Sequence, residues 1–121
     1  MILFALPANA EEGNPASRAA YLKYCSACHG EDGRGDGIVA TAMRPKPIDL
    51  TQLTPAGGPF PRARVMESID GRRRIAAHGD SEMPVWGEIF LAETGPSLSE
   101  PAEVRGRVQL ITEYVKAIQA H

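Results

Sequence analysis

Two cysteines and a histidine stand close together in the run Cys25-Ser26-Ala27-Cys28-His29. Cysteines at positions i and i+3 of a helical turn present both sulfurs on one face. Such a pair can form thioethers to the two vinyl groups on one side of a porphyrin, and the adjacent imidazole can then bind the iron. The spacing therefore predicts covalent attachment of one haem c through Cys25 and Cys28, with His29 as an axial iron ligand.

Other uses of the two thiols fit the sequence less well. A thioredoxin-like redox pair lies beside a βαβ pattern, and no segment alternates as a strand does. A structural zinc site needs four ligands, which the two cysteines and three histidines could supply only by using nearly every candidate. A disulfide between residues three positions apart closes a very small loop and stabilises little. Haem attachment is therefore the preferred interpretation.

The iron has a second axial position, opposite His29. A neutral thioether suits ferrous iron and raises the reduction potential, as in electron-carrying haem proteins. Met83 lies in a loop-like Met-Pro pair and is the predicted ligand. Met43 follows His29 closely in the sequence, and Met66 lies on a helical stripe, where methionine is usually a core filler. His78 is the main alternative, because neutral imidazole also binds haem iron.

Helices are expected to position these side chains. Asn14 and Pro15 are typical of a helix start, and this helix is expected to run into Cys25–His29. Four glycines within Gly30–Gly37 end it. Between Arg44 and Pro61 five prolines predict a long irregular stretch. A compact domain tolerates such a stretch when it is functional or packs against something, such as a cofactor.

The second half of the chain contains further expected helices. Two short ones are predicted over Arg62–Ile69 and Arg72–His78, whereas residues 82–87 read as a loop followed by an apolar patch at residues 89–91. The last helix begins at Ser99 or Glu100, and it carries the clearest apolar stripe, which comprises Val104, Val108, Ile111, Val115 and Ile118. The predicted fold class is all-α, with three to five helices.

Length and charge limit the possible functions. The chain has 121 residues and a net charge of -2, which indicates one domain without a general affinity for nucleic acid. No segment is long enough to span a bilayer. The run up to Ala8-Asn9-Ala10 is typical of a secretory signal cleaved before Glu11, although a positive n-region is missing and a plain N-terminal extension is the alternative. We interpret residues 1–10 as the remnant of a signal peptide and residues 11–121 as one exported, periplasmic domain.

Taken together, these features resemble the class I monohaem cytochromes c of the bacterial soluble type over nearly all of residues 11–121. The resemblance rests on the attachment sequence, the glycine-rich loop, the segment Arg44-Pro-Lys-Pro-Ile-Asp-Leu-Thr51, the Met-Pro loop and the amphipathic last helix. It implies a cytochrome c fold wrapped around one haem, with the first and last helices crossing. At that crossing, Tyr21 is expected to meet Ile111 and Tyr114.

The resemblance also implies an environment for the haem. A backbone carbonyl of the proline segment is expected to accept a hydrogen bond from His29, with Pro45 as the candidate and Pro47 as the next choice. Trp86 is expected to pack on the haem or to donate to a propionate. Basic side chains could pair with the propionates, and the candidates are Arg44, Lys46 and Arg72 to Arg74.

The implied function is one-electron transfer between a redox donor and an acceptor protein, by a monomer or in transient complexes, and not enzymatic turnover. One alternative is a haem c subunit of a larger periplasmic oxidoreductase. Another is a haem enzyme or gas sensor with an open sixth iron position, against which Met83 argues. The last is a purely structural exported domain without haem.

Overall fold

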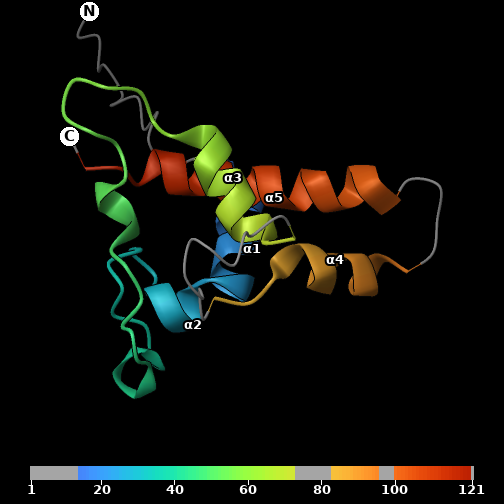
Figure 1. Ribbon diagram of the computed structural model, residues 1–121, viewed down its shortest axis with the longest axis horizontal. Helices are drawn as coiled ribbons and strands as arrows, with labels where there is room; N and C mark the ends of the chain where they lie inside the picture. The colour runs from blue at the N-terminus through green and yellow to red at the C-terminus, as the bar shows by residue number, and fades with distance from the viewer. Residues whose placement is uncertain (1–13, 73–82, 96–99, 121) are drawn as a thin grey trace, which may run out of the picture.

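The computed structural model describes residues 14–72, 83–95 and 100–120. These residues form helices and connecting segments, and no strand occurs among them (Figure 1). The all-α prediction is thus confirmed for this part of the chain. The elements in order are α1 (Pro15–Tyr24), α2 (Ser26–His29), the 3-10 turns η1 (Ala40–Ala42) and η2 (Leu50–Gln52), α3 (Arg62–Asp70), α4 (Trp86–Thr94) and α5 (Glu100–Ala117). The predicted signal remnant lies outside the described residues.

The first helix starts as its sequence predicts but is interrupted within the attachment sequence. The Asn14 side chain accepts a hydrogen bond from the Ala16 N–H at 2.9 Å, and Pro15 occupies the first turn. At Cys25 the backbone turns to φ −118° and ψ −30°, so α1 ends and the single turn of α2 begins. The His29 N–H donates to the Cys25 carbonyl at 2.9 Å. This turn places the two cysteines and the histidine together.

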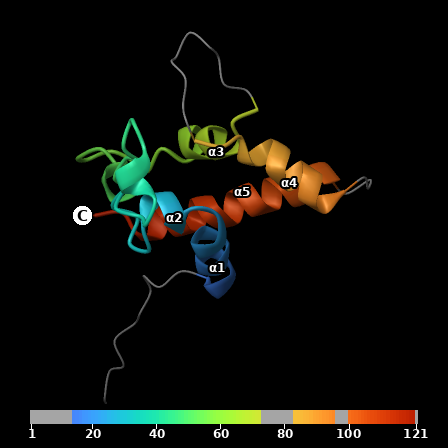
Figure 2. The same cartoon turned by 90° about the horizontal axis from the view of Figure 1, so that it is seen from below.

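Helices α1 and α5 cross steeply, and their contact forms the centre of the core (Figures 1 and 2). The rings of Tyr21 and Tyr114 lie 4.6 Å apart between centroids, as the resemblance implies, and Ile111 belongs to the same core. The stripe of α5 is also confirmed, because Val104, Val108, Ile111 and Val115 are buried and Ile118 is partly buried.

Helices α3 and α4 both pack against α5 and against each other. The prediction for α3 is confirmed with one additional residue, Asp70. The expected loop over residues 82–87 is wrong at its end, because α4 begins at Trp86 and includes the apolar patch. The helix predicted over Arg72–His78 is not seen at Arg72, which lies in a turn, and its other residues lie outside the described part.

The proline-rich stretch is held in place by one side chain from beyond α5. Gln119 is buried, and its Oε1 accepts hydrogen bonds from the backbone N–H groups of Leu53 and Thr54, both at 2.9 Å. Its Nε2 donates to the Leu50 carbonyl at 2.6 Å. A buried backbone polar group must find a partner, and Gln119 supplies three such contacts. The irregular stretch is therefore ordered through the protein itself.

Candidate functional site

A cavity of about 380 Å³ lies between α2, α3, α5 and the proline-rich stretch. Its volume falls within the range of small-molecule and cofactor sites. The site residues named from the sequence all line it, namely Cys25, Cys28, His29, Pro45, Met83 and Trp86. Apolar side chains of α3 and α5 complete the wall, including Val65, Ile69, Ile111 and Val115. The fold thus brings together residues that lie far apart in the sequence.

The two thiols differ in exposure. Cys25 is 5% exposed, whereas Cys28 is half-buried. Burial, reinforced by the nearby Cys28 thiol, raises the pKa of Cys25 to about 12. Thiols in redox-active Cys-X-X-Cys motifs have lowered pKa values, which make them reactive as thiolates. The environment of Cys25 therefore disfavours its thiolate form.

His29 is buried, and its Nδ1 lies 3.1 Å from the backbone carbonyl oxygen of Ile48. A carbonyl oxygen can only accept, so in this hydrogen bond Nδ1 carries the proton and the lone pair of Nε2 remains available. Burial lowers the pKa of His29 more strongly than the bond to Ile48 raises it. A neutral imidazole with one fixed nitrogen is the form that binds a metal.

The acceptor for His29 is Ile48, and the prediction of Pro45, with Pro47 as the next choice, is wrong. The Leu50 N–H donates to the Gly33 carbonyl at 2.6 Å and sets the register of this segment against the glycine-rich loop. Gly35 permits the close approach, since a Cβ added there would lie 2.5 Å from the Pro47 oxygen. This register brings the Ile48 carbonyl to the imidazole. Pro45 lines the cavity without accepting this bond.

Two methionines reach the cavity, Met43 and Met83, whereas Met66 packs against the hydrophobic core and does not line it. Met43 follows a segment that is bonded to the attachment turn, in which the Val39 N–H donates to the Ala27 carbonyl at 3.0 Å. It therefore directly follows a segment that packs against the attachment turn. Met83 arrives on a separate segment, which leads into α4. His78, the alternative ligand, lies outside the described residues.

An aromatic cluster borders the cavity next to Met83. Trp86 packs edge-on against Tyr24 with ring centroids 5.4 Å apart, and it stacks on Phe90 at 5.8 Å. Tyr24 and Phe90 are also in edge-to-face contact, at 4.8 Å. Both Trp86 and Tyr24 line the cavity. Sequence reasoning named Trp86 but missed its partner Tyr24, which directly precedes the first attachment cysteine.

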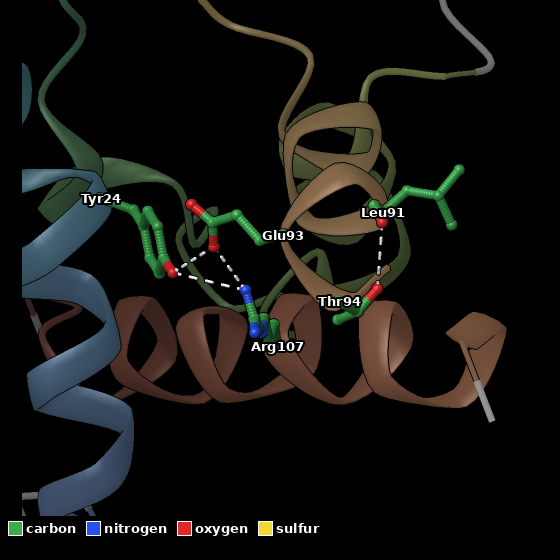
Figure 3. A network of polar contacts seen from close by, with 5 residues as sticks. All are labelled: Tyr24, Leu91, Glu93, Thr94 and Arg107. Carbon is green, nitrogen blue, oxygen red and sulfur yellow. Dashed lines mark hydrogen bonds and ion pairs between the residues drawn. The ribbon is translucent and has the colours of Figure 1, made fainter. Parts of the chain in front are cut away.

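Polar groups fix the outer end of Tyr24, as Figure 3 shows. Its hydroxyl donates to Glu93 Oε2 at 2.8 Å, and Arg107 Nη1 donates to the same carboxylate oxygen at 2.6 Å. Arg107 also lies 3.4 Å from the Tyr24 hydroxyl oxygen. The hydrogen bond from Tyr24, together with Arg107, holds the pKa of Glu93 below its usual range. The network joins α1, α4 and α5.

The basic residues at the cavity are Lys46 and Arg64. Lys46 was among the expected partners for propionates, whereas Arg72 forms an ion pair with Asp70 at 2.7 Å. Arg64 was not predicted from the sequence as a cavity residue, although it lies on the same face of α3 as three other cavity-lining residues. The cavity-lining residues of α3 recur at helical intervals and are Arg64, Val65, Ser68 and Ile69. Arg73 and Arg74 lie outside the described residues.

The chain matches no protein-family model, and no curated protein or solved structure is significantly similar to it. Among the described residues, no group of three or more His, Cys, Asp or Glu side chains is placed to hold a metal ion. None of the helices in that part of the chain is long and apolar enough to cross a membrane.

Proposed function

We propose that this protein is a one-electron carrier of the cytochrome c type, with one haem c attached through Cys25 and Cys28. The observation that supports it most directly is the shared cavity. Two cysteines, one histidine and two methionines, which carry thiol, imidazole and thioether groups, line one largely apolar space of about 380 Å³. These are the donor types that hold a covalently attached haem and its iron. When bound, haem supplies a one-electron couple.

The proposal assigns a task to each of these residues. Cys25 and Cys28 form the thioethers, and neutral His29 binds iron through Nε2 while Ile48 fixes its orientation. Met83 supplies the second axial ligand. Its neutral thioether and the apolar walls favour the less charged ferrous state, so both raise the reduction potential. Electron transfer needs no further substrate pocket, and the partners are a donor and an acceptor protein.

The test is the optical spectrum of the protein from a host that attaches haem c, in both oxidation states. A low-spin ferrous spectrum and the weak ferric sulfur-to-iron charge-transfer band are expected. Met83→Ala should abolish this band and change the spin state of the iron, whereas Met66→Ala should leave both unchanged. Loss of the band in Met43→Ala instead would assign the ligand to Met43. A low-spin spectrum without the band would point to His78.

The remaining outcomes address other functions. A high-spin spectrum in the unchanged protein would favour an enzyme or gas sensor with an open sixth position. Protein without covalent haem would overturn the proposal. Stable co-purification with an oxidoreductase would identify a haem subunit of a larger complex.

The proposal also places the carrier outside the cytoplasm, on the strength of the Ala8-Asn9-Ala10 sequence. Export should yield a mature chain that begins at Glu11 and is found in the periplasmic fraction. Mass spectrometry of the intact protein from each cell fraction measures this. An uncut chain retained in the cytoplasm would contradict the proposed location.

A further inference from the structure

We propose that Tyr24 is a positioning residue for Met83, and that it acts through Trp86 while Glu93 and Arg107 hold its phenol in place. This inference rests on the proposed function and concerns how the two parts of the site are kept together. His29 belongs to the attachment turn, whereas Met83 belongs to the segment that leads into α4. Tyr24 connects these two parts.

Tyr24 is joined to the attachment turn through the backbone. It is the last residue of α1 and directly precedes Cys25, and its ring forms part of the cavity wall. Its hydroxyl donates to Glu93 Oε2 of α4 (Figure 3). Arg107 of α5 donates to the same carboxylate oxygen and also lies near the Tyr24 hydroxyl oxygen. Hydrogen bonds to charged groups are stronger than those between neutral groups. The orientation of the ring is therefore set by two other helices.

Trp86 connects the Tyr24 ring to the segment that carries Met83. It is the first residue of α4, and its N–H donates to the Pro84 carbonyl at 3.0 Å, so Met83 directly precedes a short hydrogen-bonded turn that ends at Trp86. One side of the indole meets Tyr24 and another meets Phe90, which is fully buried. Aromatic contacts of this geometry are worth ~1 kcal/mol beyond their burial. A displaced Tyr24 ring would loosen Trp86 and, with it, the Met83 turn.

The two ligands should respond differently when the network is weakened. His29 is held by its own hydrogen bond to Ile48 and by the helical turn of α2. Met83 directly precedes the turn that ends at Trp86, so its position also follows the packing of Trp86. Loss of the Tyr24 hydroxyl or of the Glu93 charge should therefore weaken the methionine side of the site selectively.

The chain offers a matched control for this test. Glu113 of α5 forms an ion pair with Arg62 of α3, and its side chain is 48% exposed, compared with 40% for Glu93. Neither Glu113 nor Arg62 lines the cavity. Glu113→Gln therefore removes a similar surface ion pair on the same helix without touching the Tyr24 network.

The experiment titrates the ferric, haem-loaded protein with imidazole, which competes with Met83 for the iron. Tyr24→Phe and Glu93→Gln should each bind imidazole about three- to tenfold more tightly than the unchanged protein, since the first removes the hydrogen bond from Tyr24 to Glu93 and the second removes the charge that strengthens it. Both should also show a weaker sulfur-to-iron charge-transfer band. Glu113→Gln should change neither the imidazole affinity nor the charge-transfer band, even if it lowers the thermal midpoint as much as the other two variants do.

Two outcomes would overturn the inference alone. In one, Tyr24→Phe and Glu93→Gln bind imidazole like the unchanged protein. In the other, imidazole affinity follows thermal stability in every variant, including Glu113→Gln, so the effect is only structural. An unchanged protein that lacks the charge-transfer band has no Met83 ligand, and this result overturns the Met83 assignment together with the inference, whereas protein without covalent haem overturns the proposed function itself.

Discussion

At the scale of single residues, the hydroxyl of Ser17 is buried without a hydrogen-bond partner among the described residues. The residue is 1% exposed and lies one turn before Tyr21 on α1. A buried hydroxyl without a partner carries an uncompensated desolvation cost. The small size of the Ser17 side chain therefore explains its presence at this buried position better than its polarity does.

We expect Ser17→Ala to raise the free energy of unfolding by about 1 kcal/mol, because it removes the unpaired hydroxyl and improves helix propensity. Equilibrium denaturation with urea measures the change. Thr112→Val is the control, since the Thr112 hydroxyl donates to the Val108 carbonyl at 2.7 Å. A gain in the control as large as in Ser17→Ala would contradict the explanation.

The cavity-lining residues that were predictable from the sequence are those with rare chemical groups and a recognisable local sequence. Cys25, Cys28 and His29 form one short pattern, and Met83 stands out by its neighbour proline. Ile48 could not be found in this way, because it contributes a backbone carbonyl that every residue has. Its selection depends on a register that only the folded glycine-rich loop defines.

At the scale of elements, the start of α4 packs closely against the C-terminal end of α3. A Cβ added at the buried Gly87 would lie 2.5 Å from Asp70 Oδ1 and 2.6 Å from Arg72 Nε. The ion pair between these two side chains thus occupies the space that any larger residue at this position would need. The glycine fixes how closely the segment after Met83 approaches α3.

We expect Gly87→Ala to lower the free energy of unfolding by about 1–3 kcal/mol, the usual cost of overpacking. Gly106→Ala is the matched control, since a Cβ there meets nothing within 4 Å and alanine favours the helix. Thermal unfolding of both variants measures the difference. Equal stabilisation by the two alanines would show that α4 is not seated as described.

Gln119 is the second element-scale contact that can be tested. We expect Gln119→Ala to destabilise the protein by about 2–3 kcal/mol, because it leaves two backbone N–H groups and one carbonyl without their partner. Gln109→Ala removes an exposed glutamine of α5 and should have little effect. Hydrogen exchange at Leu53 and Thr54 should accelerate only in the first variant.

The helices differ in how well they can be predicted from their sequences. The stripe of α5 is long and periodic, and α1 begins with a side-chain cap, so both were predictable. Helix α4 has no side-chain cap, and its apolar residues Ile89, Phe90 and Leu91 are consecutive, so they show no helical period. It is a helix because tertiary packing buries Phe90 against α1 and α5, which a local pattern does not reveal.

At the scale of the whole molecule, part of the hydrophobic core also forms the wall of the cavity. Val65 and Ile69 of α3 face it, as do Ile111 and Val115 of α5. Under the proposed function these side chains pack against haem. A domain of this size buries little apolar surface on folding, so its stability depends on each part of the core.

We therefore expect the haem-free double variant Cys25→Ser/Cys28→Ser to retain helical content but to lose fixed tertiary packing. Far-ultraviolet and near-ultraviolet circular dichroism during heating distinguish the two properties. A sharp cooperative transition in the double variant, at the temperature of the haem-loaded protein, would contradict the expectation.

Stability should also fall in acid, because hydrogen bonds from Tyr24 and Arg62 hold the pKa values of Glu93 and Glu113 below the ordinary 4.5. A lowered folded-state pKa gives a contribution that is complete above the unfolded-state value and is lost as pH falls through the folded-state value. Thermal midpoints should thus decline below about pH 4.5. Glu93→Gln/Glu113→Gln should decline less steeply, and an unchanged slope would contradict this account.

The burial of Cys25 bears on the order of events during biosynthesis. The residue is 5% exposed, it belongs to the same core as Tyr21 and Tyr114, and it lines the cavity. A vinyl group must reach the Cys25 sulfur for a thioether to form. Under the proposed function, attachment therefore takes place on a chain that has not yet closed around the cavity, and maturation is a timed sequence in which the covalent step comes before the final closure.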